Sequence, residues 1–164
     1  MIVISDASPV INLAIIEHLS LLPRLFGKVV LPRQVFDEIT VTGFGMPGAD
    51  LVKDADWIEI KVCRDQPLFE ALKLQVDPGE AAAIALALEL KADLLLIDER
   101  IGRQVAQHFQ LPIMGLVGVL SLAKQKGFIE NMQEILDRLI EEAKFRISPD
   151  LYREVLRNEG ELPE

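Results

Sequence analysis

Two aspartates stand where apolar segments of this sequence stop. Asp6 follows the apolar stretch at residues 2–5, and Asp98 ends the stretch at residues 93–98. In an open parallel sheet, ligands bind outside the carboxyl ends of the strands, at the point where the strand order reverses. If both stretches are neighbouring strands at that point, the two carboxylates face one crevice. The alternative is that each aspartate only caps the helix that follows it.

Two glutamates extend this pattern. Glu80 opens a run of alanine, leucine and isoleucine at residues 80–90, and it is the only early charge on what we expect to be a buried helix. A first-turn glutamate also complements the helix dipole, a role worth about 0.3–1 kcal/mol. Glu38 lies near the end of a predicted helix over residues 33–39, where negative charge is mildly unfavourable. The helix face alone does not rank Glu38 above its neighbour Asp37.

The types of these side chains indicate a particular metal chemistry. Carboxylates brought together repel one another, and some then keep their protons at neutral pH unless a cation is bound. Mg²⁺ prefers oxygen ligands, often one or two carboxylates plus substrate phosphates. The two histidines, His18 and His108, are not paired at ligand spacing, which argues against a zinc site. An all-carboxylate set therefore favours Mg²⁺ or Mn²⁺ and phosphoryl transfer to water.

The elements that must position these acids alternate between strands and helices. Strands of nearly continuous apolar residues are predicted at residues 2–5, 28–32, 57–62, 93–98 and 111–115. Helices are predicted at residues 9–17, 18–26, 33–39, 67–74, 80–90, 99–109, 116–126, 131–145 and 149–160, with a further short helix before the third strand. Such an alternation indicates a parallel sheet covered on both faces. We therefore expect one three-layer α/β/α domain over residues 1–164, with a parallel sheet of about five strands.

Composition limits the class of protein. Half of the 164 residues are hydrophobic, and mean hydropathy is +0.26, values typical of a globular domain. We expect no membrane span and no signal peptide, because no apolar run approaches about 20 residues and the N-terminus lacks a basic region. The single cysteine, Cys63, excludes an internal disulfide framework and fits a cytoplasmic protein. A net charge of −9 argues against nucleic-acid binding through a broad basic surface, but not against an acidic site that works through bound cations.

Other sites have weaker support. Residues 43–48 read GFGMPG and fit the dinucleotide pattern GxGxxG, but they follow a helix and not the first strand. We expect them to form a flexible loop at the rim of the site. A phosphatase with an aspartate nucleophile would want a second acid two residues after Asp6, where Ser8 stands. A phosphoryl-receiver domain would want a lysine after the last strand, and residues 112–118 contain none.

A family resemblance follows from the segments that carry these residues. In chain order, the sequence contains SDASPVINL, LFGKVVLPRQVFDEI, DPGEAAAIALALEL, LLLIDERIGRQVA and PIMGLVGVLSLAKQKG. Together they resemble the PIN-domain superfamily, and more narrowly its prokaryotic branch related to VapC-type toxins. The resemblance covers residues 2–129, which we take as the family-like core, with C-terminal helices over residues 130–164. It implies a parallel sheet with three or four acids at the strand ends, Mg²⁺- or Mn²⁺-dependent ribonuclease activity and, for VapC-type members, inhibition by an antitoxin protein.

The family's acids can be carried over position by position. They fall on Asp6, Glu38, Glu80 and Asp98, so the resemblance favours Glu38 over Asp37. We expect Asp6, Glu80 and Asp98 to ligate the metal, with Glu38 as a further ligand or as the carboxylate that orients the attacking water. The third acid is usually aspartate in the family, and the longer glutamate changes its reach toward a metal.

Four further residues receive secondary assignments. Ser8 and Asn12 match small polar positions beside the first acid, and we expect them to hydrogen-bond to the metal ligands; a solvent-facing Asn12 is the alternative. Arg100 occupies a place where many relatives carry another acid. Arg100 and Arg103 could contact substrate phosphates, although exposed charges on a surface helix are the more ordinary interpretation.

The sequence thus predicts a metal-dependent endoribonuclease that acts on single-stranded RNA, in the manner of a VapC-like toxin. The different class left open is an acidic metal- or nucleic-acid-binding module, inactive or weakly active, under the control of a protein partner. The apolar stripe at Met132, Ile135, Leu136, Leu139 and Ile140 could serve a homodimer or an antitoxin as well as the core.

Overall fold

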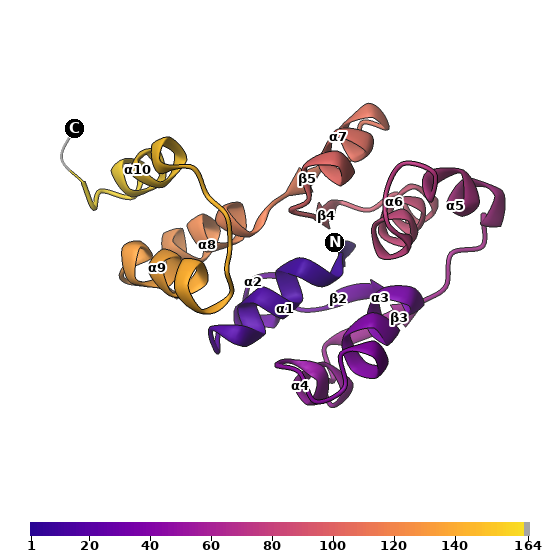
Figure 1. Cartoon of the computed structure of the whole chain (residues 1–164), viewed down its shortest axis with the longest axis horizontal. Helices are drawn as coiled ribbons and strands as arrows, with labels where there is room; N and C mark the ends of the chain where they lie inside the picture. Colours follow the sequence, from indigo (N-terminus) through magenta and orange to yellow (C-terminus); the bar gives the residue numbers. More distant parts are fainter. Residues whose placement is uncertain (163–164) are drawn as a thin grey trace.

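The structure is a computed structural model that describes residues 1–162 (Figure 1). The strands are β1 (Val3–Ser5), β2 (Val29–Pro32), β3 (Ile58–Lys61), β4 (Leu94–Leu96) and β5 (Ile113–Met114). The helices are α1 (Ala7–Ile15), α2 (Leu21–Phe26), α3 (Arg33–Asp37), the π-helix η1 (Glu38–Thr42), α4 (Ala49–Lys53), α5 (Gln66–Leu72), α6 (Pro78–Leu90), α7 (Arg100–His108), α8 (Leu116–Gln125), α9 (Met132–Glu142) and α10 (Pro149–Asn158). The predicted order of strands and helices is confirmed, with shorter elements than the apolar runs suggested.

The five strands form one sheet in the order β3-β2-β1-β4-β5, and every pairing is parallel. The central β1 has Ile4 opposite Val30 of β2 on one side and opposite Leu95 of β4 on the other. The chain adds β2 and β3 outward on one side of β1, and then returns to build β4 and β5 on the other. The strand order therefore reverses between β1 and β4, the place where open parallel sheets bind ligands.

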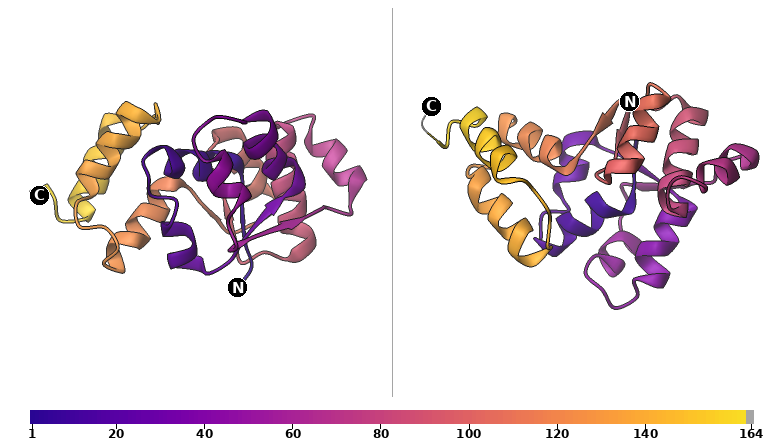
Figure 2. Two further views of the ribbon diagram at one scale, coloured as in Figure 1. Left: turned by 90° about the horizontal axis from the view of Figure 1, so that it is seen from below. Right: turned by 45° about the horizontal axis from the view of Figure 1, so that its top comes forward.

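Alternating strand residues supply two separate hydrophobic cores, one on each face of the sheet. Val3, Leu31 and Leu96 pack with α1, α2, α8, α9 and α10, whereas Ile4 and Leu95 pack with α5, α6 and α7. Successive strand side chains point to opposite faces, so a sheet covered on both sides needs apolar residues at every position. Figure 2 shows the two helical layers on either side of the strands, which confirms the three-layer α/β/α arrangement.

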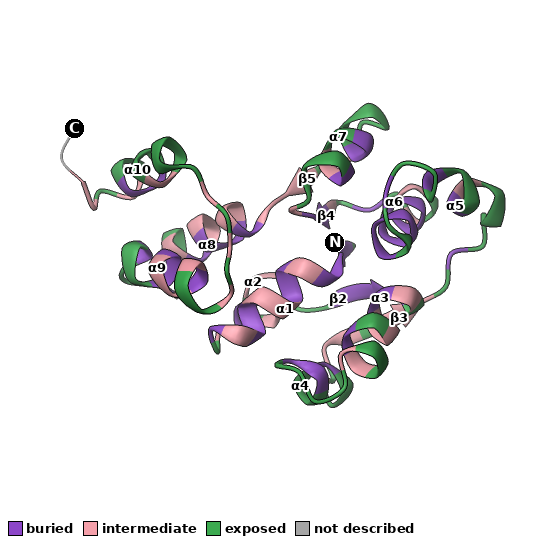
Figure 3. Ribbon diagram, in the orientation of Figure 1, coloured by how far each residue is buried: buried purple, intermediate pink, exposed green. Residues whose placement is uncertain are grey.

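Helix α6 is the most deeply enclosed helix, and its burial follows from its composition. Residues 79–87 are all buried, as the purple ribbon of Figure 3 shows. Alanine has the highest helix propensity and a small side chain, so a helix rich in alanine can lie close against neighbouring elements. It contacts α3, α5 and α7 as well as β1, β2 and β4. This packing fixes the N-terminus of α6, and with it Glu80, beside the end of β1.

The C-terminal helices complete the first core. Met132, Ile135, Leu136 and Leu139 are buried within it, so most of the stripe that was a candidate partner surface belongs to the core of this chain. The Glu161 carboxylate accepts hydrogen bonds from the main-chain N–H groups of Met132 and Gln133, at 2.7 and 2.9 Å, and thereby ties the end of the described chain to the start of α9.

Two local differences from the sequence-based expectation matter for the site. The helix predicted over residues 33–39 ends at Asp37 and continues as the π-helix η1, a rare wide turn that often occurs at functional sites. The helix predicted over residues 131–145 ends at Glu142, because Lys144 adopts a left-handed backbone conformation with φ of 57°. Residues 143–147, which we call the strap, belong to no helix or strand. No helix within residues 1–162 is long and apolar enough to cross a membrane.

Candidate metal centre

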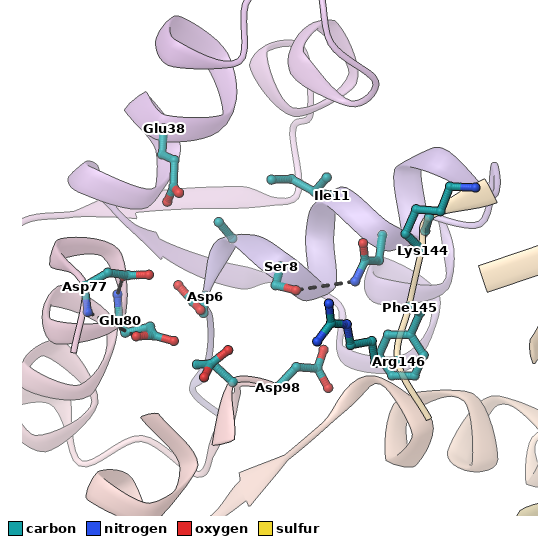
Figure 4. A pocket seen from close by; sticks show the side chains of 14 residues that line it. Asp6, Ser8, Ile11, Glu38, Asp77, Glu80, Asp98, Lys144, Phe145 and Arg146 are labelled. Carbon is teal, nitrogen blue, oxygen red and sulfur yellow. Dashed lines mark hydrogen bonds between the residues drawn. The ribbon is translucent and has the colours of Figure 1, made fainter. Parts of the chain in front are cut away.

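A pocket of about 500 Å³ opens at the carboxyl ends of β1 and β4, where the strand order reverses. Carboxylates from the ends of strands and the starts of helices line it, and Figure 4 shows four of the labelled ones facing the same space. The acidic lining residues are Asp6, Glu38, Asp77, Glu80, Asp98 and Glu99. The four acids that the sequence singled out therefore line a single pocket.

Asp6 is a buried carboxylate that caps no helix. The residue is 5% exposed, and although it occupies the N-cap position of α1, its side chain makes no capping hydrogen bond to the second or third residue of that helix. Its main-chain N–H donates to the carbonyl of Leu96 at 2.9 Å, which joins the ends of β1 and β4. Burial raises the pKa of Asp6 to about 7, repulsion by Glu80 adds to the shift, and the N–H of Ala7 opposes it.

Asp98 is held by a helix other than the one that follows it. Its Oδ1 accepts a hydrogen bond at 2.8 Å from the N–H of Leu116, the first residue of α8, rather than from α7. Its Oδ2 is buried and has no hydrogen-bond partner within the described chain. Burial raises the pKa of Asp98, while the Leu116 N–H and the nearby Arg103 lower it. A buried oxygen without a partner is costly and is usually satisfied by water or an ion.

Glu80 takes part in a reciprocal cap at the start of α6. Its N–H donates to Asp77 Oδ1 at 2.8 Å, and its own Oε2 accepts from the N–H of Asp77 at 3.1 Å. Burial raises the pKa of Glu80 to about 7; the Asp77 N–H opposes this shift, and repulsion by Asp77 and Glu99 adds to it. The capping role and a role at the pocket are therefore compatible in one side chain.

Glu38 reaches the pocket from the opposite wall, at the junction of α3 and η1. Its pKa is raised, first by burial and then by repulsion from Asp77. The space between Glu38 and Asp6 depends on Gly79, where a methyl group would lie 2.9 Å from Glu38 Oε2 and 3.5 Å from Asp6 Oδ1. Asp77 Oδ1 lies 3.5 Å from the same point, so three carboxylates approach one spot. Asp37 does not line this pocket.

The secondary residues divide between the pocket and its surroundings. Ser8 and Asn12 line it, and Asn12 Nδ2 donates to Ser8 Oγ at 3.4 Å (Figure 4). Arg103 lies behind Asp98, where its Nη1 donates to the carbonyl of Ile97 at 2.9 Å. Arg100 is exposed and does not line the pocket. Residues 43–48, which we expected at the rim, are not part of the lining either.

Sequence reasoning missed two groups of lining residues. Asp77 and Glu99 add two acids, and the spacing of Asp77 to Glu80 is that of a capping box, a signal that could have marked Asp77. The strap brings Phe145 and Arg146 to the pocket from far along the chain. No local pattern marks the strap, because its position depends on how α9 packs against the rest of the fold.

The side chains that line the pocket carry the kind of ligand atom that a hard divalent cation prefers. The acids that line the pocket supply only oxygen ligands, two of them (Asp6 and Glu80) are buried, and one buried oxygen lacks a partner. As the side chains stand, no three His, Cys, Asp or Glu residues of the described chain are grouped closely enough to hold an ion. Burial, with repulsion between the carboxylates adding to it, raises the pKa values of Asp6 and Glu80 and so favours their protonated forms when no cation is bound.

Comparison with known proteins identifies the family. A family model described as a PIN domain matches residues 2–161, so this chain belongs to the PIN-domain family. Neither the curated proteins nor the solved structures give a significant match. PIN domains are generally nucleases, which act on nucleic acids and use divalent metal ions. The resemblance stated from the sequence is confirmed at this level, and the closer relation to VapC-type toxins stays a prediction.

Proposed function

We propose that this protein is a metal-dependent endoribonuclease that hydrolyses phosphodiester bonds in single-stranded RNA. The observation that supports the proposal is the convergence of acids from β1, η1, α6 and the end of β4 on one pocket at the switch point of a PIN-domain sheet. The unpartnered buried oxygen of Asp98 adds to it, because this atom is satisfied when a cation is present.

In this proposal Asp6, Glu80 and Asp98 hold Mg²⁺ or Mn²⁺. A bound divalent cation supplies Lewis-acid stabilisation of the charge that develops on the phosphate oxygens. Glu38 holds the attacking water and accepts its proton, for which its raised pKa suits it. The water oxygen bonds to phosphorus, the bond from phosphorus to one ribose oxygen breaks, and that oxygen leaves as a hydroxyl after taking a proton from solvent.

The form of the substrate follows from the shape and charge of the site. A backbone phosphate must enter a pocket between helices, and a flexible single strand does so more easily than a duplex. The chain carries a net charge of −9, so RNA binding without divalent cation should be weak. Ser8 and Asn12, joined by their hydrogen bond, would orient the first acid or the bound water.

The test compares RNA cleavage by the wild type, Asp6→Asn and Asp98→Asn in Mn²⁺, in Mg²⁺ and with a chelator. We expect cleavage only in the wild type with cation, and a loss of at least about 100-fold in each variant. Asp37→Asn is the matched control for Glu38→Gln. Because Asp37 lies outside the pocket, its substitution should leave cleavage unchanged, whereas Glu38→Gln should reduce it. Metal-independent cleavage, or cleavage that survives both aspartate substitutions, would contradict the proposal. Cation binding without cleavage would favour the non-catalytic binding module.

The narrower biological role is also proposed. A cytoplasmic VapC-like toxin should arrest growth when expressed alone, Asp6→Asn should not, and an antitoxin partner should relieve the arrest. Exposed apolar side chains beside η1 offer a surface for a homodimer or for that partner; they are Val41, Phe44, Met46 and Leu51. Sedimentation of the wild type and Phe44→Ser tests the homodimer, which a monomer at every concentration would contradict.

A further inference from the structure

A second pocket, of about 510 Å³, adjoins the carboxylate pocket on the far side of Asp98. It lies between β5, the start of α8 and the strap with the beginning of α10. Asp98, Phe145 and Arg146 line both pockets, so the two spaces meet along these residues. We call the second space the Arg146 pocket. Its size is within the range of pockets that hold small organic molecules.

The lining of the Arg146 pocket differs in character from that of the carboxylate pocket. Its walls are largely apolar and include Met114, Phe145 and the exposed Leu151. Its polar members include two arginines, Arg103 and Arg146, in a chain with a strong excess of acids. Apolar walls together with guanidinium groups suit a flat ring that is attached to an anion, which is the chemistry of a nucleotide.

Arg146 is placed to bind an anion at the junction of the two pockets. Figure 4 shows its guanidinium directed toward the pocket, near Ser8. It makes no ion pair and no hydrogen bond with any residue in the described part of the chain. Lys144, two residues earlier on the strap, points away in the same view, and its Nζ donates to the carbonyl of Glu141 at 3.0 Å.

The strap holds Arg146 through its partly buried neighbours. Ala143, Phe145 and Ile147 pack against the first core, and the N–H of Phe145 donates to the carbonyl of Leu139 at 3.0 Å. Lys144 and Arg146, which lie between them, are exposed. These contacts fix the backbone position from which Arg146 reaches the pocket.

We propose that the Arg146 pocket binds the nucleotide next to the scissile phosphate of a single-stranded RNA. Arg146 contacts the phosphate between the two pockets, and the base lies against Phe145, Met114 and Leu151. This inference rests on the proposed ribonuclease function, and it adds that the enzyme reads one base beside the cut. The recognition is by stacking and apolar contact, which permits a preference among bases without strict specificity.

The experiment uses the full chain, Mn²⁺ and a pool of single-stranded RNA with randomised sequence, and the cut ends are sequenced. The wild type should show a base preference concentrated at one position beside the cut. Met114→Ala and Leu151→Ala should flatten the preference at that position alone. A general loss of structure would instead lower cleavage at all sequences equally. The thermal unfolding midpoint of each variant shows directly whether its stability has changed.

Kinetics on one RNA taken from the cut pool test the phosphate contact. Arg146→Ala should raise KM by about 10- to 100-fold while kcat stays within about threefold. Arg146→Lys should recover part of the loss, and Arg157→Ala, a control at an exposed arginine of α10 that lines neither pocket, should leave KM unchanged. In a plot of log KM against the logarithm of salt concentration, the slope for Arg146→Ala should be smaller than that of the wild type by about 0.7. This is the value for one phosphate contact to a single strand.

Two failures can be told apart. If the wild type cuts no RNA with Mn²⁺ or Mg²⁺, the proposed function fails, and the nucleotide site fails with it. If the wild type cuts RNA but Leu151→Ala keeps the wild-type base preference and Arg146→Ala keeps its KM, only the nucleotide site is overturned.

Discussion

Asp77 and Glu80 hold each other by reciprocal hydrogen bonds at the start of α6, at 2.8 and 3.1 Å. The cap uses Oε2 of Glu80 and leaves Oε1 without a hydrogen bond to the described chain, near Gly102. A bound cation would therefore not have to displace the cap in order to reach Glu80. One residue stabilises a helix and presents a charge to the pocket, and substitutions can separate these two roles.

Glu80→Gln should retain the cap and lose the charge. Glutamine also fits this position of a capping box, so the midpoint of thermal unfolding at pH 8 should equal or exceed that of the wild type. Cleavage of RNA with Mn²⁺ should fall by at least about 100-fold, because a buried ligand charge is gone. Glu80→Ala serves as the control that loses both roles and about 1 kcal/mol of stability. Wild-type cleavage by Glu80→Gln would exclude Glu80 from the metal site.

Gly79→Ala should move stability and activity in opposite directions. Alanine is the better helix former, so the free energy of unfolding should rise by up to about 0.5–1 kcal/mol. The new methyl group would lie 2.9 Å from Glu38 Oε2, and the flexible Glu38 side chain must move away from Asp6. Cleavage should therefore fall, while chemical denaturation shows a protein as stable as the wild type or more so. Unchanged activity would indicate that Glu38 works from elsewhere.

The stability of the cation-free protein should decrease as pH rises through neutrality. Asp6 and Glu80 both have a pKa raised to about 7, from ordinary values of 3.8 and 4.5. The folded protein therefore binds their protons more tightly than the unfolded chain does, and this stabilisation is complete below about pH 4 and lost as pH rises through about 7.

Chemical denaturation of the wild type and Asp6→Asn across this range measures the effect. The wild type should lose roughly 2 kcal/mol or more relative to Asp6→Asn between about pH 5 and about pH 8. Mn²⁺ should restore the wild type near pH 8 and have little effect near pH 5, where protons compete for the same oxygens. Parallel pH profiles for the two proteins would contradict the buried, proton-binding state of Asp6.

Much of the fold was predictable because the local sequence signals for strands and helices agree with the elements that the structure contains. Continuous apolar runs such as residues 94–97 indicate a strand covered on both faces, and Pro32 and Asp77 mark helix starts. The ends of elements were less predictable. Residues 38–42 form a π-helix, and the strap begins at residue 143, because packing against distant elements, and not local propensity, decides both.

The site was predictable in part for the same reason. Asp6 and Asp98 are marked by the strands that they follow, whereas the pairing of β1 with β4 that brings them together needed the structure. Local residues alone did not choose between Asp37 and Glu38, and only Glu38 lines the pocket. Arg146 carries no local signal, since more than 40 residues separate it from Asp98 in the chain. Long-range packing places it, and a sequence pattern does not reveal such packing.

Two substitutions at Asp98 should separate the effect of its hydrogen bond with the Leu116 N–H from the effect of its charge. Asp98→Asn retains an oxygen that can accept from the Leu116 N–H, and it replaces the unpartnered Oδ2 by an amide that can donate to a neighbouring carboxylate. Its stability without cation should equal or exceed that of the wild type, while Mn²⁺ affinity, measured by calorimetry, falls by about 10-fold or more. Asp98→Ala should lose the same affinity and also about 1 kcal/mol of stability, because the first N–H of α8 loses its acceptor. If Asp98→Asn bound Mn²⁺ as tightly as the wild type, the buried Oδ2 would need another partner, and Asp98 would be a cap for α8 and nothing more.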